Sequence, residues 1–212
     1  MLFGFILDLL FPPRPLVREL MRMELAEFAA RVRKAAHSPG KGMISCFDYH
    51  DALVRQAVWE LKYRGNKKIA RLLGAALYDE LLAFLEEYAP LESFTEPLLI
   101  PLPLSKARES ERGFNQCELL ADVLVELDNG RNFTRSRGLA KIKDTPSQTK
   151  SDTRKKRLEN LKDCFSAHEG IIAGRNIILI DDVATTGATL SEARRTLLRA
   201  GARKVIAFTV AH

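Results

Sequence analysis

The sequence predicts an α/β fold: an open, mostly parallel sheet with flanking helices, preceded by a helical N-terminal extension. Two observations carry this prediction. Short apolar runs alternate with helical repeats over residues 96–212, as in sheets whose parallel strands are joined by helical crossovers. Residues 176–189 read NIILIDDVATTGAT, so four apolar strand formers run directly into two aspartates and then into a turn that opens a helix. Ligands of parallel sheets bind at such strand ends.

The N-terminal part is predicted to be mainly helical. Prolines follow an apolar start at residues 1–11, and apolar residues then recur at helical spacing over 16–36. The SPGKG stretch at 38–42 is a loop and the best domain boundary. Beyond it we expect a strand and two helices, at residues 43–49, 51–63 and 68–88. The predicted division is therefore an extension over 1–42 and a domain over 43–212, with a hood-like part at 43–95 and a core at 96–212.

The predicted core alternates strands with helices. Its expected strands lie at residues 96–104, 139–143, around Phe165, 176–180 and 204–210. Its expected helices lie at 115–127 and 189–200, and its expected loops at 105–114 and 144–160.

Positive charge is concentrated in one segment. The net charge is +6 over 212 residues, but residues 131–162 hold eleven Lys and Arg against three Asp and Glu, which leaves the rest slightly acidic. This pattern predicts a polyanionic partner at one place on the molecule. A triphosphate-like ligand and nucleic acid are the two candidates.

The cysteines indicate neither a disulfide framework nor a zinc site. Cys46, Cys117 and Cys164 are scattered, with no CxxC pair, which fits a reducing cytoplasm. Cys117 falls inside a predicted helix without a nearby histidine, so we assign it to packing. We expect a cytoplasmic protein.

The apolar start at residues 1–11 is too short to span a membrane. It also contains Asp8 and lacks a basic segment before it, so we expect neither a signal peptide nor a transmembrane helix. We expect it to dock on its own domain or on a partner, and a homodimer is one such arrangement.

Two other residue types give no functional signal in the sequence. His37, His50, His168 and His212 are too scattered for a metal cluster. Trp59 and the other aromatic residues do not alternate with basic residues as in an RNA-binding surface.

The IILIDDVATTGAT stretch predicts a sugar-phosphate site. Its threonines and glycine precede a helix, whose free backbone N–H groups and dipole attract a phosphate. The two aspartates suit the hydroxyl pair of a ribose or a hard cation. The alternative is that these acids merely cap the next helix. The candidate residues are Asp181, Asp182, Ala184, Thr185, Thr186, Gly187, Ala188 and Thr189.

The predicted loop at 105–114 is a second candidate anion site. It joins a strand end to a helix start, as the first site does, and it carries three cations and a glycine. The alternative is a solvated basic surface. The candidate residues are Lys106, Arg108, Arg112 and Gly113.

The basic loop at 144–160 is the third candidate element. A polar loop between two strands can close over a charged ligand and exclude water. Its cations would stabilise negative charge on that ligand. The alternatives are a disordered linker and a nucleic-acid patch. The candidate residues, counted from just before the loop, are Lys143, Lys150, Arg154 and Arg157.

The IILIDDVATTGAT stretch resembles the signature of type I phosphoribosyltransferases that binds phosphoribosyl pyrophosphate (PRPP). The resemblance narrows to the ComF family through FDYHDALVRQAVWELKYRG at 47–65, IPLPLSKARESERGFNQCELLADVL at 100–124 and TPSQTKSDTRKKRLENLKDCF at 145–165. It implies the type I phosphoribosyltransferase fold, with the two acids on the ribose hydroxyls and the following loop on the 5′-phosphate. It also implies PRPP as ligand and Mg²⁺ as its cofactor.

The resemblance carries further residues and one departure. Arg112-Gly113-Phe114-Asn115 matches the pyrophosphate-loop region, Thr145, Gln148, Arg157 and Asn160 match the flexible loop, and Lys62 and Arg64 lie in a block expected to line the site. ComF proteins usually carry a cysteine-rich zinc ribbon after LLFPPR, which this sequence lacks.

Three functions stay open at this point. One is transfer of phosphoribose to an unidentified nitrogenous acceptor with release of pyrophosphate. A second is non-catalytic binding of PRPP or a nucleotide in competence and DNA uptake, through competence proteins. The third is direct binding of single-stranded DNA by the basic segment.

Overall fold

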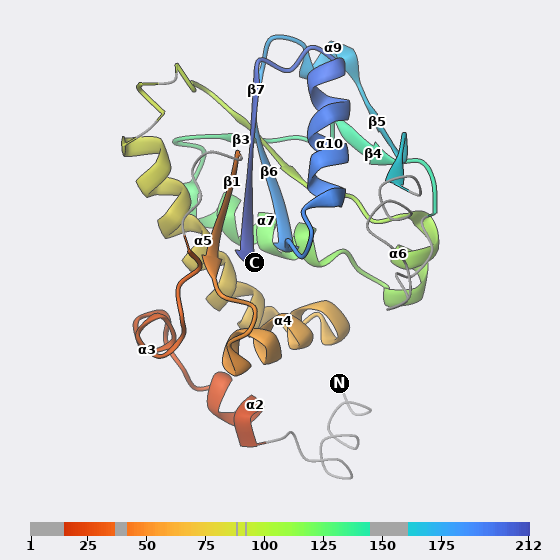
Figure 1. The fold of residues 1–212 in the computed structure, drawn as a ribbon. Helices are drawn as coiled ribbons and strands as arrows, with labels where there is room; N and C mark the ends of the chain where they lie inside the picture. The colour runs from red at the N-terminus through yellow and green to blue at the C-terminus, as the bar shows by residue number, and fades with distance from the viewer. Residues whose placement is uncertain (1–14, 37–41, 88, 92, 145–160) are drawn as a thin grey trace.

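A five-stranded parallel sheet forms the centre of the computed structural model, which describes residues 15–36, 42–87, 89–91, 93–144 and 161–212 (Figure 1). The strand order is β1-β7-β6-β2-β3, and every neighbouring pair is parallel. The strands are β1 Met43–Phe47, β2 Leu98–Pro101, β3 Thr134–Arg135, β6 Asn176–Val183 and β7 Lys204–Ala211. This arrangement confirms the predicted fold class.

The middle strand β6 is buried on both faces, which explains its continuous apolar run. Ile177 and Leu179 belong to one buried cluster, whereas Ile178 and Ile180 belong to the cluster on the other face. Side chains alternate along a strand, so a run of apolar residues supplies both cores at once. Burial of this strand fixes the position of the residues at its carboxyl end.

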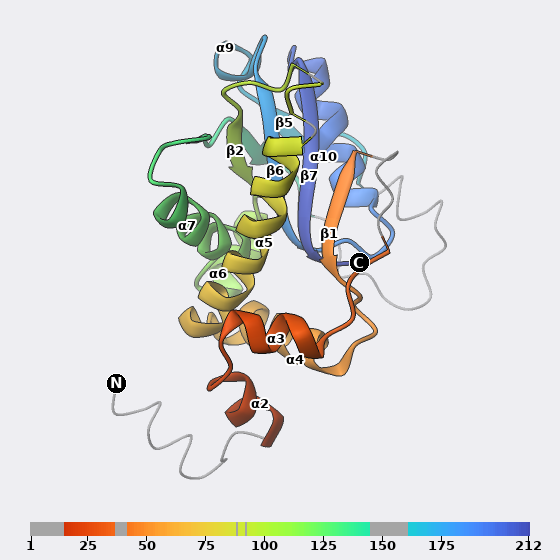
Figure 2. The ribbon, with the colours of Figure 1, turned by 90° about the vertical axis from the view of Figure 1, so that its left-hand side faces the viewer.

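Helices cover both faces of the sheet. On one face lie α5 (Lys67–Glu87) and α7 (Gln116–Asp128), which pack against each other, and on the other lies α10 (Ala188–Arg199) (Figures 1 and 2). The helix α4 (Ala52–Arg64) lies beyond the carboxyl ends of β6 and β7, with α2 (Pro15–Leu20) and α3 (Leu25–Arg31) outside it (Figure 1). Residues 43–95, expected to be hood-like, thus also supply β1 to the sheet and α5 to one of its faces.

The N-terminal helix expected over residues 16–36 is wrong as a single element. The structure has two short helices, α2 and α3, separated by a turn at 21–24. Because α2 packs on α4 while α3 packs on α5, the chain has to change direction between them. The predicted extension over 1–42 therefore lies against the rest of the chain wherever it is described.

Five further elements differ from the predictions. The expected loop at 105–114 contains a helix, α6 (Lys106–Arg112). The segments β4 (Leu139–Lys141) and β5 (Phe165–Ala167) do not join the parallel sheet but form a separate antiparallel pair. The short β3 and the helix α9 (Glu169–Ile172) were not predicted, since two and four residues are too few to show a period. None of the helices in the described ranges is long and apolar enough to cross a membrane.

Close packing of α5 on α7 depends on Gly74, and this predicts an unusual mutational effect. A Cβ at this position would lie 2.7 Å from Val123 Cγ1 and 2.8 Å from Val123 Cβ. Alanine favours helices by about 1 kcal/mol over glycine, but overpacking costs about 1–3 kcal/mol. We expect Gly74→Ala to lower the free energy of unfolding measured by chemical denaturation. The double variant Gly74→Ala/Val123→Ala should lose less free energy of unfolding than the two single variants lose together. A Gly74→Ala protein more stable than wild type would contradict the close contact.

Candidate functional site

Two adjacent carboxyl groups lie buried at the carboxyl end of the central strand. Asp181 and Asp182 are 7% and 3% exposed. They lie inside β6, which we had expected to end at residue 180; the strand continues because its pairing with β7 runs as far as Val183 and Ala211. The N-cap of α10 is Gly187 and has no side-chain capping bond. The two acids therefore do not cap this helix, and the capping alternative is wrong.

Each carboxyl group is held by donors from other elements. Lys62 Nζ, from α4, lies 3.0 Å from Asp182 Oδ2, and Gln116 Nε2 donates to Asp182 Oδ1 at 3.4 Å. The Cys117 thiol donates to Asp181 Oδ1 at 3.4 Å, as does the Asp182 backbone N–H at 2.8 Å. The site thus joins β6 to the first turn of α7 and the last turn of α4.

The electrostatics of the pair differ between the two acids. Burial, and after it the charge of the neighbouring Asp182, raise the pKa of Asp181 to about 8. Burial also acts to lower the pKa of Lys62, but the Asp182 charge outweighs this effect and the net shift is upward. At neutral pH the site therefore holds a protonated Asp181 beside an Asp182–Lys62 ion pair.

Cys117 is confirmed as a packing residue that also touches the site. The side chain is buried, and burial, followed by the Asp181 and Asp182 charges, raises the pKa of its thiol well above the ordinary value. A thiol with a raised pKa stays protonated, so it is a poor nucleophile and a poor metal ligand. Its role in this geometry is to donate a hydrogen bond to Asp181.

The threonine and glycine turn lies directly against the two acids. A small hollow at the start of α10 is lined by residues of this turn and by Asp181, and Gly187 adopts φ 70° where the helix begins. Thr185 and Thr186 are exposed, and the Thr186 hydroxyl accepts a bond from the Ala188 N–H at 3.4 Å. The lining residues are Asp181, Val183, Ala184, Thr185, Thr186, Gly187, Ala188, Thr189 and Leu190. Seven of the eight predicted residues thus line the hollow, and the eighth, Asp182, lies beside it and donates its backbone N–H to Asp181.

The second candidate anion site is only partly assembled around this centre. Arg112 donates to Gln116 Oε1 at 3.1 Å, and Gln116 in turn reaches Asp182. Arg108 is half-buried, Lys106 is exposed, and Gly113 ends α6 with φ 76°. The N-terminus of α7 is already capped by the Asn115 side chain, which accepts from the Cys117 N–H at 2.9 Å. An anion here would be bound by guanidinium groups rather than by this helix end.

The third candidate element lies mostly outside the described residues. Of its members Lys143 is described and is exposed, whereas Thr145, Gln148, Lys150, Arg154, Arg157 and the matched Asn160 fall in the range 145–160. A residue that we did not predict, Lys141, lies closer to the centre. Burial lowers its pKa, the Arg108 charge lowers it further, and Asp181 acts in the opposite direction. Lys141 and Lys143 are two residues apart, so strand alternation places them on the same face and could not have distinguished them.

The block of Lys62 and Arg64 also holds an aromatic surface that we had excluded. Lys62 reaches the acids, but Arg64 turns away and lies 5.5 Å from the Trp59 ring centre. Arg112 lies 5.4 Å from the Tyr63 ring centre, and the two rings are 5.4 Å apart. The prediction that aromatic residues do not interleave with basic ones is therefore wrong: helical spacing and α6 bring them together in space.

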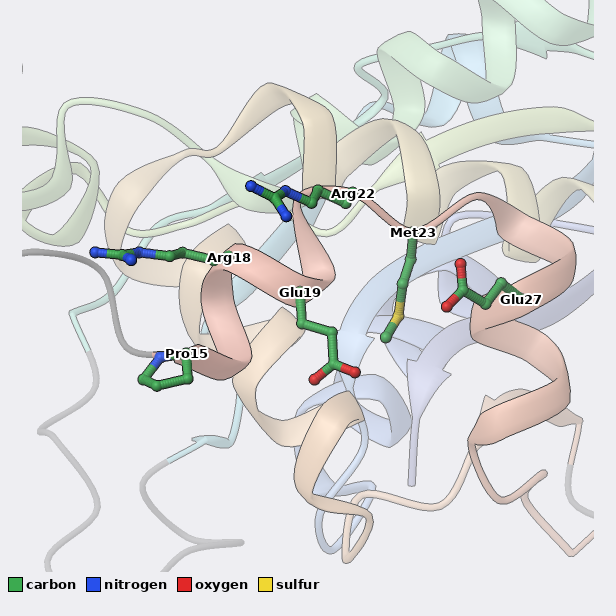
Figure 3. Close-up of a pocket in the computed structure, with 6 residues that line it drawn as sticks. All are labelled: Pro15, Arg18, Glu19, Arg22, Met23 and Glu27. Atoms are coloured by element: carbon green, nitrogen blue, oxygen red, sulfur yellow. The ribbon is translucent and has the colours of Figure 1, made fainter.

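A second groove lies between α2 and α3, away from the predicted residues. Figure 3 shows Met23 between Glu19 and Glu27 at this groove, and Glu19 also pairs with Arg31 of α3 at 2.7 Å. The lining residues are Pro15, Arg18, Glu19, Arg22, Met23 and Glu27. Its mixed charges form no anion site.

Comparisons with known proteins agree with this geometry. A family model described as the phosphoribosyl transferase domain matches residues 118–212. The chain is 36% identical over 176 residues to competence protein ComFC of Bacillus subtilis (strain 168), covering 78% of this chain and 62% of that protein. It is 32% identical over 172 residues to DNA utilization protein YhgH of Salmonella typhi, covering 79% and 70%. A solved structure of glutamine PRPP amidotransferase from B. subtilis, complexed with ADP and GMP, has 16% identity and a TM-score of 0.44, covering 72% of this chain and 30% of that chain.

The sheet, the site and the matched domain define a phosphoribosyltransferase-fold protein. Within that class the identity to YhgH, over most of that protein's length, decides the family: the chain belongs to the ComF family. Its match spans less than two thirds of the B. subtilis relative.

The raised pKa of Asp181 predicts a pH-dependent gain in stability from its removal. As the pH rises above the ordinary carboxyl pKa, the unfolded chain releases this proton while the folded chain retains it. The wild type therefore loses free energy of unfolding up to the folded-state pKa. Because Asn is neutral throughout, Asp181→Asn should exceed wild type at pH 7.5 by more than about 1 kcal/mol, the value of one pKa unit.

Denaturant unfolding measured from pH 4 to pH 8 tests this prediction. The difference between Asp181→Asn and wild type should shrink toward pH 4, because the unfolded chain begins to bind the proton near the ordinary carboxyl pKa. Asp79→Asn, at an exposed position of α5, is the matched control and should track the wild type. A variant destabilised equally at all pH values would contradict a protonated Asp181.

Proposed function

We propose that this protein binds PRPP and transfers its phosphoribose to a nitrogenous acceptor, releasing pyrophosphate. The observation that carries the proposal is the buried Asp181–Asp182 pair beside the hollow at Gly187. The two acids would accept hydrogen bonds from the ribose hydroxyls, and the turn at Thr185 and Thr186 would bind the 5′-phosphate. Hydroxyl donors or a cation arriving at Asp181 would favour its ionised form, so ligand binding and loss of its proton are coupled.

The acids also fit a magnesium ion. Asp182 Oδ2 is buried, and Lys62 Nζ lies 3.0 Å from it without good hydrogen-bond geometry, so this oxygen can still accept a ligand. Carboxylate oxygens are ligands that Mg²⁺ accepts, whereas the Cys117 thiol is unsuited to it. When bound with PRPP, Mg²⁺ would neutralise charge on the pyrophosphate oxygens. Asp181 and Asp182 are the residues that would face it.

The chain's cations would stabilise the leaving group. Arg112 donates a hydrogen bond to Gln116, which in turn donates one to Asp182. Lys141 and Arg108 add positive charge nearby. In the transfer, the bond between the sugar carbon and a pyrophosphate oxygen breaks with its electron pair on pyrophosphate. The acceptor nitrogen bonds to that carbon and loses a proton to water. The charges that gather on pyrophosphate are those that guanidinium groups bind well.

The proteins that match this chain favour a role connected with DNA. They carry the names competence protein and DNA utilization protein. We propose that the phosphoribosyl chemistry of this chain serves competence or DNA use in the cytoplasm. A protein that binds PRPP without turnover would serve the same process as a sensor.

Calorimetry with PRPP and Mg²⁺ tests the site. We expect binding by the wild type and at least a tenfold loss of affinity in Asp181→Asn and Asp182→Asn, because an amide replaces a hydrogen-bond-accepting carboxylate. Asp79→Asn should bind as the wild type does. Since Asp181→Asn is expected to be the more stable protein at neutral pH, its loss of binding would not reflect unfolding. Absence of binding heat in the wild type would sink the proposal.

Turnover separates an enzyme from a sensor. Incubation with PRPP, Mg²⁺ and a panel of nucleobases, nucleotides and amines should release pyrophosphate with one class of acceptor. Asp182→Asn should reduce the rate at least a hundredfold, because both ligand and Lys62 lose their charge partner. PRPP binding without release of pyrophosphate for any acceptor would leave the sensor as the function.

A further inference from the structure

The outer face of α4 carries an exposed aromatic pair. Trp59 and Tyr63 are 45% and 57% exposed, and they are the exposed aromatic side chains among the described residues. They lie four residues apart on one helix, with ring centres 5.4 Å apart and planes inclined at 43°. Two exposed rings side by side expose apolar surface to water, which is costly unless a ligand uses it.

One arginine guanidinium lies over each ring of the pair. Arg64 lies 5.5 Å from the Trp59 ring centre and Arg112 lies 5.4 Å from that of Tyr63. Arg55, one turn before Trp59, is also exposed. The one carboxylate in α4, Glu60, is 1% exposed, and its Oε2 lies 3.8 Å from Arg64 Nη1. The outer face of α4 therefore combines π surface with positive charge and presents no negative charge.

A continuous series of contacts connects this surface to the two acids. Tyr63 stacks with Arg112, Arg112 donates to Gln116, and Gln116 donates to Asp182. Lys62, the residue before Tyr63, contacts Asp182 directly. A ligand on the aromatic pair is thus within a few side chains of a sugar held by the acids.

The geometry points to a nucleobase subsite on Trp59 and Tyr63, where a base stacks on the rings while Arg64 and Arg112 bind adjacent phosphate or the base edge. Every nucleobase has a π face, so stacking on aromatic rings with flanking guanidinium groups suits bases as a class. The inference rests on the proposed function, in which the base would belong to the acceptor. The two rings are open rather than enclosed, so they admit a free base and a base within a single strand alike.

Intrinsic fluorescence tests the subsite, because Trp59 is the single tryptophan of the chain. The full-length protein is excited at the tryptophan absorption edge and titrated with adenine, AMP and a thymidine oligonucleotide. Ribose 5-phosphate and inorganic pyrophosphate are the controls without a base. We expect saturable quenching by at least one base-containing probe and none by the two controls. Free N-acetyltryptophanamide corrects for absorption and for collisional quenching.

Variants separate stacking from charge. Tyr63→Leu keeps the reporter and removes one ring, and it should weaken the affinity of the quenching probe about tenfold or more. Tyr63→Phe, which keeps the ring, should restore it. Arg64→Gln should weaken the binding of AMP and of the oligonucleotide more than that of adenine. Such a difference would show that Arg64 binds a phosphate of the ligand. Leu198→Ala, an exposed apolar residue on α10, should leave the affinity unchanged.

Several outcomes would overturn the subsite. These are equal quenching by ribose 5-phosphate, equal affinity in Tyr63→Leu and wild type, or no response to any base. Emission that changes with protein concentration rather than with ligand would overturn it in favour of self-association. PRPP calorimetry on the same variants keeps the two proposals apart, because Tyr63→Leu should still bind PRPP. If the wild type does not bind PRPP but bases still quench its fluorescence, only the proposed function is rejected.

Discussion

Burial of two adjacent carboxyl groups at the end of β6 is the constraint on which the rest of the site depends. Two neighbouring negative charges in a dry environment are costly, and the structure reduces the cost in two ways. Asp181 keeps a proton, and Lys62 supplies a positive charge to Asp182. The ion pair between Lys62 and Asp182 requires α4 to lie across the strand ends (Figure 1). The Lys62–Asp182 ion pair therefore adds to the apolar packing that positions this helix.

The turn that follows α4 lets the end of this helix pack close to the acid pair. Gly65 ends the helix with φ 56°, and a Cβ there would lie 3.0 Å from the Phe114 ring. The end of α4 therefore packs against the segment between α6 and α7, close to the residue that pairs with Asp182. The residues after Phe114 supply the remaining donors, Gln116 and Cys117. One packing contact thus fixes both sides of the acid pair.

The strands and helices with a strong period could be predicted from the sequence, and those without one could not. β6 and α10 each carry a continuous pattern, so the acids and the turn between them could be located from the sequence. The segment of α6, KARESER, is mostly charged and buries no residue, so no apolar period marks it as a helix. Lys141 was missed in favour of Lys143 because no partner strand was known to orient β4. The aromatic surface was missed because Arg112 is distant from Tyr63 in sequence.

The helix period lets α4 serve two surfaces at once. Consecutive residues are turned by about 100°, so Lys62 reaches the acids while Tyr63, its neighbour, faces solvent. Residues four apart are nearly aligned, so Trp59 falls beside Tyr63 on the outer face. Anything that repositions α4 would therefore alter the charge on Asp182 and the aromatic surface together. Because Arg112 touches Tyr63 and, through Gln116, Asp182, occupation of one surface by a ligand changes the surroundings of the other. The link between the two surfaces is thus a property of one helix and one arginine.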